Sequence, residues 1–286
     1  MRTIKLTELN EYIETLDKLR GKLPNRKGGW IIGRGVFSSG YDLLNELLPN
    51  KSYFHVMVLN ATGRMPDDDF CAWLEAIYIC LSWPDPRIWC NTIGSLGATA
   101  RASVLASTTA GLVASESRLY GPQTLVGGVE FIQSCHKRVS SGEPINEALH
   151  ALVKKSRGKL HAPGYVRPIA DGDDRVDIML KYAEKIGFKM GKHIKLGLEI
   201  ESYLIENYGQ SMNVGGYISA FLADQKFTSK EVYSLFPTMV SSGITACYVD
   251  DADKPAGHFL PLRCDDIEYD GPEERTLSIK YKKSSK

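Results

Sequence analysis

The stretch Ala162-Pro163-Gly164-Tyr165-Val166-Arg167-Pro168-Ile169, followed by Asp173-Asp174-Arg175, decides how this sequence is interpreted. Proline and glycine residues on both sides of Tyr165 indicate a loop rather than a helix. Arg167 within it carries a permanent charge on a planar fork that suits a carboxylate. Two kinds of partner stay open for Arg167: an acidic ligand, or one of the nearby acids Asp171, Asp173 and Asp174.

On both sides of this loop the chain reads as a series of helices. Asp67-Asp68-Asp69 offers N-cap acceptors, and apolar residues then recur at helical spacing until Pro84-Asp85-Pro86. Residues 99–117 are mostly small, which lets neighbouring helices approach closely, so we expect one helix there, in the core or at a subunit interface. Further helices are predicted at 128–138, 145–157, 175–187, 195–207, 216–225 and 229–242.

Strand signals are few. Residues 29–33 suit a short ribbon, and residues 267–269 and 277–279 alternate in the manner of strands. Because none of these implies a sheet core and no repeat or linker is evident, the predicted fold class is all-α.

Composition excludes several classes of partner. The 286 residues hold 35 Lys and Arg against 34 Asp and Glu, so no global charge favours nucleic acid or an anionic membrane. The start lacks a signal-peptide core, and residues 102–115 are too short and rich in hydroxyl groups for a membrane span. The six cysteines form no C-x-x-C pair, which predicts a reduced, cytoplasmic protein.

Cofactor signals are equally weak. Gly33-x-Gly35 lacks the third glycine and the parallel-sheet pattern of a dinucleotide site. His136 and His150 lie in predicted helices without a companion at metal-ligand spacing, so no metal is predicted.

Several short motifs, in order, resemble the citrate synthase superfamily. The loop resembles its Pro-Gly-Phe-Gly-His-x-Val stretch and following Asp-Pro-Arg. The other matching segments are Gly33-Arg34-Gly35 with Tyr41-Asp42-Leu43, 51–66, Thr99-Ala100-Arg101, Tyr120-Gly121-Pro122, Gly127-Gly128, Asn213-Val214-Gly215-Gly216, Arg263 and Tyr269-x-Gly271-Pro272. The short length and the Gly127-Gly128 pattern look most like citryl-CoA lyases, including the terminal module of ATP-citrate lyase.

The resemblance implies an all-α homodimer whose protomer has two helical domains. Its large domain would hold residues 1–126 and 226–286. Residues 127–225 would form the small domain, which closes over coenzyme A (CoA) and a dicarboxylate. A CoA thioester is then a co-substrate, and no permanently bound cofactor is expected.

The family's proton-transfer residues are replaced in this chain. Gly215 stands where the family has the aspartate that acts as base, and Arg167 where it has the carbonyl-polarising histidine. Cys247 matches a further lyase histidine, and Val126 matches the histidine that steadies the enol, with a two-residue insertion just before it at Gln123-Thr124. Glycine cannot act as a base, and arginine cannot accept a proton near neutral pH.

Other matched positions keep groups that bind ligands. Arg175 and Arg263 match carboxylate-binding arginines of the family, and the one that Arg263 matches reaches across to the partner subunit. Arg101 is a third candidate for substrate binding. Arg175 has the alternatives of pairing with Asp177 or capping a helix, and Arg263 lies beside Asp265-Asp266, where a surface ion pair is the alternative.

The loop itself supplies the remaining candidates. Gly164, Tyr165 and Val166 are the candidates for binding CoA, with Tyr165 either stacking on adenine or filling the domain hinge. His161 either replaces a lost acid–base group or is an exposed loop residue, and Cys247 is either a nucleophile or a core residue.

Three functions compete on this basis. The first is a lyase or synthase that makes or cleaves a carbon–carbon bond in a carboxylic acid or its CoA thioester, with Arg167 and His161 as candidate catalytic groups. The second is a non-catalytic homologue that binds a dicarboxylate or CoA ester, or regulates an active paralogue. The third is an enzyme that uses Arg167 as an electrophile on a different acid, without enolising a thioester.

Overall fold

The computed structural model describes residues 6–156, 158–165 and 172–276. Val166 and Arg167 therefore lie outside the described residues, as does the predicted strand at 277–279. The chain is mainly helical, which confirms the all-α prediction. Within the described ranges no helix has the length and apolar character needed to cross a membrane.

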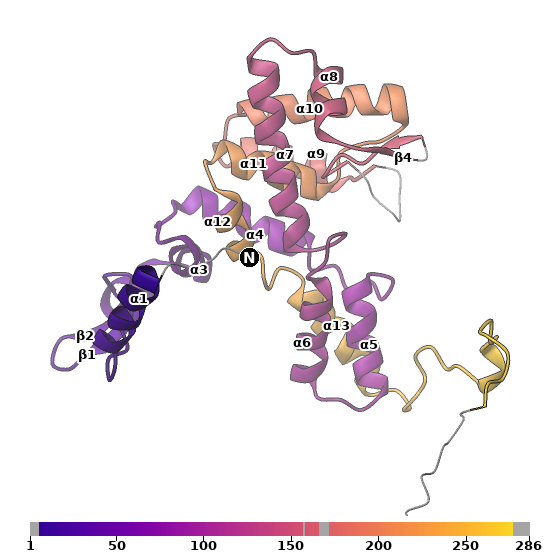
Figure 1. Cartoon of the computed structure of the whole chain (residues 1–286), viewed down its shortest axis with the longest axis horizontal. Helices are drawn as coiled ribbons and strands as arrows, with labels where there is room; N and C mark the ends of the chain where they lie inside the picture. Colours follow the sequence, from indigo (N-terminus) through magenta and orange to yellow (C-terminus); the bar gives the residue numbers. More distant parts are fainter. Residues whose placement is uncertain (1–5, 157, 166–171, 277–286) are drawn as a thin grey trace, which may run out of the picture.

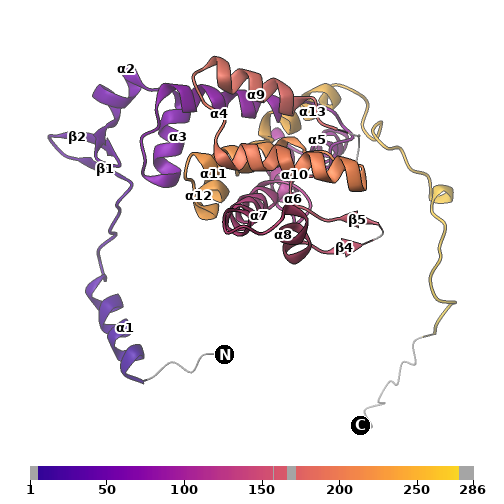
Figure 2. The same ribbon diagram turned by 90° about the horizontal axis from the view of Figure 1, so that it is seen from above.

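The N-terminal part consists of one helix and a small antiparallel sheet. Helix α1 (Leu6–Lys18) lies apart from the other helices (Figure 2), and the ribbon predicted near residue 30 is confirmed by three short strands. The strands are β1 (Gly28–Ile31), β2 (Gly35–Ser38) and β3 (Tyr41–Asp42). A π-helical turn (Leu43–Leu47) and α2 (Leu48–Asn50) follow.

Helices α3 (Tyr53–Thr62) and α4 (Asp68–Cys80) come next, and α4 begins as predicted. The Asp67 carboxylate accepts the Phe70 N–H at 2.7 Å, which satisfies one of the free donors at the helix start. The buried face of α4 centres on Trp73, whose ring stacks on Phe221 with 3.9 Å between centroids. The Trp73 Nε1–H also donates to the Tyr217 hydroxyl at 3.0 Å, which joins α4 to a helix more than 140 residues later.

Helices α5 (Trp89–Thr99), α6 (Val104–Ser115) and α13 (Ser241–Ala252) pack together as one three-helix unit (Figure 1). Glycines permit this closeness: a Cβ on Gly97 would lie 2.1 Å from the Ser107 Oγ, and one on Gly94 would lie 2.5 Å from the Ile244 carbonyl oxygen. The expectation that small residues mark close helix contacts is correct here.

The prediction of one continuous helix at 99–117 is wrong. The chain turns sharply at Arg101, whose φ is +63°, and α5 and α6 form two helices on either side. Much of α6 is also exposed in the protomer, with Leu105 at 76%. Helix α6 is therefore not at the centre of the protomer core.

The remaining helices gather around α11 (Figure 1). They are α7 (Pro122–Ser140), α8 (Ile145–Leu152), α9 (Arg175–Lys185), α10 (Lys192–Tyr208), α11 (Val214–Asp224) and α12 (Ser229–Leu235), with a hairpin of β4 (Lys155–Ser156) and β5 (Lys159–Leu160) after α8. Helix α11 is buried on nearly every side, because α4, α7, α9 and α10 surround it. Helix α4, which belongs to the predicted large domain, thus packs directly on α11 of the predicted small domain.

Three further predictions need correction. The helix predicted at 145–157 ends at Leu152, and the β4–β5 hairpin follows. The helix predicted at 229–242 is two helices, since α12 ends at Leu235 just before Phe236-Pro237 and α13 begins at Ser241. Residues 267–269 form no strand; they follow a 3₁₀ turn (Cys264–Asp266) in an exposed C-terminal segment.

Candidate functional site

The start of α11 holds both ends of the loop that carries the family-like sequence. The Asn213 N–H donates to the Gly164 carbonyl at 2.8 Å, and the next N–H, of Val214, donates to the Asp173 carboxylate at 2.9 Å. Asn213 also caps the helix, since its Oδ1 accepts the Gly216 N–H. Residues 164 and 173, which flank the undescribed segment 166–171, are thereby fixed at the same helix end.

Two glycines make the close approach of loop and helix possible. Gly164 has a φ of +87°, and a Cβ there would lie 2.4 Å from the Gly216 Cα. A Cβ on Gly216 would in turn lie 2.5 Å from the Gly164 carbonyl oxygen. Backbone atoms cannot move aside as a flexible side chain does, so this contact requires glycine at both positions.

The variant Gly164→Ala should lose about 2–3 kcal/mol of unfolding free energy, through left-handed backbone strain and overpacking. Urea denaturation of both proteins measures this. Gly127→Ala is the matched control, because a Cβ at Gly127 in α7 meets no atom within 4 Å. Equal urea midpoints for wild type and Gly164→Ala would contradict the close contact.

Asp173 and Arg175 form the charged part of the site. The Arg175 Nε and Nη2 donate to the two Asp173 carboxylate oxygens, each at 2.7 Å. The Asp173 side chain is only 1% exposed, whereas that of Arg175 is 28% exposed. The Arg175 Nη1 lies 3.4 Å from the Cys80 carbonyl oxygen at the end of α4. The ion pair therefore links α4, α9 and the start of α11, with Asp173 rather than Asp177 as the partner of Arg175.

A groove of 410 Å³ lies beside the loop residue Pro163. Helix α7 and the segment around the β4–β5 hairpin line it, through Gly127, Glu130, Phe131, Ser134, Leu152, Val153, Lys154, His161 and Pro163. The charged residues that line the groove are Glu130 and Lys154. Lys155 and Lys159 on the adjoining hairpin are exposed, and the Lys155 Nζ lies 5.3 Å from the Tyr208 ring centre.

The sequence analysis missed this basic hairpin, because it assigned residues 145–157 to one helix. The signal was present in Gly158, whose φ of +77° lies at the turn between the two strands. A glycine among polar residues between two short strands is a hairpin signal.

His161 and Tyr165 have different environments. His161 is exposed and lines the groove. The Tyr165 ring is buried beside Phe131, and its hydroxyl donates to the Gly197 carbonyl at 2.9 Å. Burial raises the pKa of this hydroxyl. The suggested stacking of Tyr165 on adenine is therefore corrected: its side chain fills the core, and only the backbone of this residue remains for a ligand.

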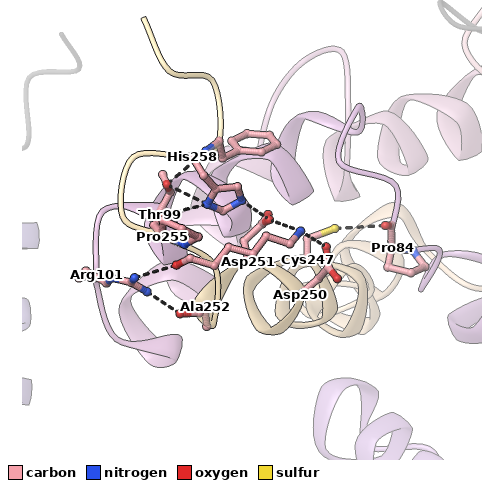
Figure 3. Close-up of polar contacts among 11 residues, drawn as sticks. Pro84, Thr99, Arg101, Cys247, Asp250, Asp251, Ala252, Pro255 and His258 are labelled. Atoms are coloured by element: carbon pink, nitrogen blue, oxygen red, sulfur yellow. Dashed lines mark hydrogen bonds and ion pairs between the residues drawn. The ribbon is translucent and has the colours of Figure 1, made fainter.

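Arg101 is not brought to this site within the protomer. Its guanidinium donates to the carbonyls of Ala252 and Lys254, the latter at 2.7 Å, at the C-terminal end of α13 (Figure 3). A cation there complements the helix dipole. The α5–α6 connection lies at the end of the three-helix unit that faces away from α7 and α11 (Figure 1). Within the protomer Arg101 therefore caps α13, and its assignment to substrate binding stays a prediction.

Cys247 also has a structural environment. Its thiol donates to the Pro84 carbonyl at 3.2 Å (Figure 3), and burial, reinforced by Asp251 and other acids, raises its pKa to about 11. A thiol protonated at neutral pH is a poor nucleophile, so the core-packing interpretation is the better one.

The other two positions matched to family catalytic groups offer no titratable side chain: Gly215 lies in the first turn of α11, and Val126 lies in α7. Arg263 lies in the exposed C-terminal segment, where its backbone N–H donates to the Asp266 carboxylate at 2.7 Å. Among the described residues, no group of three or more His, Cys, Asp or Glu side chains is arranged to hold a metal ion.

Comparisons with known proteins agree with this architecture. No family model and no curated protein matches the chain. Among solved structures, citryl-CoA lyase from Hydrogenobacter thermophilus superposes with a TM-score of 0.72 at 21% identity, covering 89% of this chain and 97% of that one.

Two further structures are similar. ATP citrate lyase from Methanothrix soehngenii, solved with citrate and coenzyme A, gives a TM-score of 0.71 at 15% identity over 96% of this chain and 45% of its own. Citrate synthase from Thermoplasma acidophilum, solved with carboxymethyl coenzyme A and oxaloacetate, gives a TM-score of 0.61 at 17% identity, covering 81% of this chain and 60% of that one. The chain therefore has a citrate synthase-like fold.

Proposed function

We propose that this protein makes or cleaves a carbon–carbon bond in a carboxylic acid or its CoA thioester, in a citryl-CoA lyase-like manner with a non-standard active site. The observation that carries the proposal is the start of α11, which binds Gly164 and Asp173 through consecutive N–H groups. This arrangement places the loop, the Arg175 ion pair and Gly215 together. The similar structures with bound citrate, oxaloacetate or CoA compounds support the same ligand classes.

The CoA thioester would lie along the groove between α7 and the hairpin. Its phosphates suit Lys154, Lys155 and Lys159, because ammonium groups attract phosphate as point charges. The backbone at Pro163-Gly164-Tyr165 would enclose the adenine, and Val166 would continue this contact. CoA is a co-substrate in this proposal and not a resident cofactor.

The acid would lie against the arginines at the start of α11. Arg175 has N–H groups outside its fork with Asp173, and Arg167 would stabilise negative charge on a carbonyl or alkoxide oxygen. Arg263 would come from the second protomer of a homodimer. His161, exposed on the groove, is the candidate proton-transfer group. We place the protein in the reducing cytoplasm.

A second function has its own support. Gly215 offers no base, and Asp173 already neutralises Arg175. Both observations favour a non-catalytic homologue that binds a dicarboxylate or CoA ester, or one that pairs with an active paralogue. Native mass spectrometry of freshly purified protein tests for a retained acid or CoA ester.

The variant Arg175→Lys should bind citrate, oxaloacetate or malate about tenfold more weakly than wild type, since lysine keeps the charge but loses the planar fork. Titration calorimetry with each acid and its CoA ester measures the affinity. Arg87→Lys is the matched control, because the Arg87 Nε and Nη2 form the same fork with the two carboxylate oxygens of Asp85 but Arg87 is largely exposed.

Binding and turnover, measured together, distinguish the enzyme, the non-catalytic homologue and a purely structural role of Arg175. Binding together with product formation supports the enzyme, and binding without any turnover supports the non-catalytic homologue. If no acid or thioester binds the wild type, or if Arg175→Lys binds as well as wild type, the arginine is structural.

A further inference from the structure

A buried carboxylate lies at the C-terminal end of α13, far along the chain from the α11 site. The Asp251 side chain is 6% exposed and accepts hydrogen bonds from the His258 Nε2 and the Lys254 Nζ, both at 2.8 Å (Figure 3). Burial disfavours the charge, but the bonds from Lys254 and His258 hold the pKa of Asp251 below its usual range. Both donors come from residues after the helix end.

The same segment is tied to the end of α5. The Gly257 N–H donates to the Thr99 carbonyl at 3.1 Å, and the Phe259 N–H donates to the Thr99 hydroxyl at 3.3 Å. From the other side, the Arg101 guanidinium binds the carbonyls of Ala252 and Lys254. We call this set, Asp251, Lys254, His258, Thr99 and Arg101, the latch. It joins two helices to the nine residues 251–259.

Directly after the latch the chain becomes fully exposed. Leu260 has a φ of +52°, and every residue from 260 to 276 is exposed, so that this arm extends away from the helical body (Figures 1 and 2). The arm carries exposed apolar residues, with Leu262 at 72% and Tyr269 at 76%. Exposed apolar side chains in an extended segment suit burial against another surface.

The energetics indicate that the direction of the arm matters. Burying Asp251 is costly unless it keeps its charged donors. A chain end that only needs to stop a helix does not require a buried carboxylate, a histidine and two backbone bonds to a separate helix. The latch fixes residues 251–259 against α5, and thus fixes the point and direction from which the arm leaves.

We propose that Asp251 and His258 are positioning residues that set the exit direction of the arm, and thereby place Arg263 at the α11 site of the second protomer. Neither residue touches the ligand. The placement of Arg263 rests on the proposed function, whereas the ordering of the arm by the latch does not.

The test uses the exposed Cys264, which lies within the arm, as a site for a spin label on the full-length protein. In His258→Ala the label should become more mobile, while light scattering still shows a dimer. In His258→Gln it should stay as in wild type, because the glutamine amide can donate to Asp251 from a similar position. His150→Ala, an exposed histidine in α8, is the matched control and should leave the label unchanged.

Calorimetry with citrate then links the latch to the site. His258→Ala and Arg263→Ala should each weaken citrate binding about tenfold. The double variant should bind citrate no more weakly than Arg263→Ala alone, because both changes act through the same residue. An unchanged label in His258→Ala, a label equally mobile in His258→Gln, or a monomeric wild type would overturn the proposal. If the wild type binds no acid but the label responds as expected, the latch stands and the proposed function fails.

Discussion

The purified protein should release thiol from acetyl-CoA and oxaloacetate about 10²–10⁴-fold more slowly than an ordinary citrate synthase, the usual cost of losing a positioned general base. The position matched to the base is Gly215, in the first turn of α11. Beside it, the Asp173 carboxylate is held by Arg175 and the Val214 N–H, and Asn213 carries an amide. Neither group is suited to remove the methyl proton of a thioester.

A thiol-reactive dye measures this activity, with an authentic citrate synthase as the positive control. Citryl-CoA is tested in a separate assay that measures oxaloacetate, because a lyase would cleave it to acetyl-CoA and oxaloacetate without releasing a free thiol. In Gly215→Asp the new Cβ would lie 3.1 Å from the Asn213 Oδ1, so the carboxylate is accommodated only if Asn213 shifts slightly. Thiol release by the wild type at ordinary citrate synthase rates would show that Gly215 does not occupy the base position.

The variant Trp73→Ala should lose about 3–5 kcal/mol of unfolding free energy, the usual cost of removing a fully buried large aromatic side chain. Trp73 is 0% exposed, stacks on Phe221 and donates to Tyr217. Its loss leaves a cavity between α4 and α11 and leaves the Tyr217 hydroxyl without the indole donor. We expect the start of α11, and with it the loop, to lose order first.

Urea denaturation followed by circular dichroism gives the free energies. Trp30→Ala is the control, because Trp30 in β1 is 73% exposed and should change stability by no more than about 0.5 kcal/mol. If both tryptophan variants lose the same small amount, α4 does not stabilise α11 in the way described here.

The sequence was sufficient for the fold class and for the position of the loop. Helical periodicity, the Asp67 cap and the order of the short motifs depend on residues that are near one another in the chain. The same local signals placed the ribbon near Trp30 and the helix start at Asp68. Matching of motifs also predicts that Gly215 stands at the position of the family's base.

Local sequence patterns did not predict where a turn ends a helix when the residues on both sides of the turn suit a helix. The small residues at 99–117 suit a helix throughout, yet a positive φ at Arg101 divides them, since packing of α5 and α6 against α13 favours two short helices. The apolar pattern after Pro144 likewise gave no sign that the helix stops at Leu152 and a hairpin follows.

Side-chain partners were decided by the tertiary structure alone. From the sequence, Arg175 had a ligand, Asp177 or a helix end as alternatives, and Tyr165 had a ligand or the hinge. The structure pairs Arg175 with Asp173 and buries Tyr165 against Phe131, and it turns Arg101 toward α13. The physical reason is that each choice depends on which distant backbone groups and side chains packing brings within hydrogen-bonding or contact distance, and sequence spacing does not contain that information.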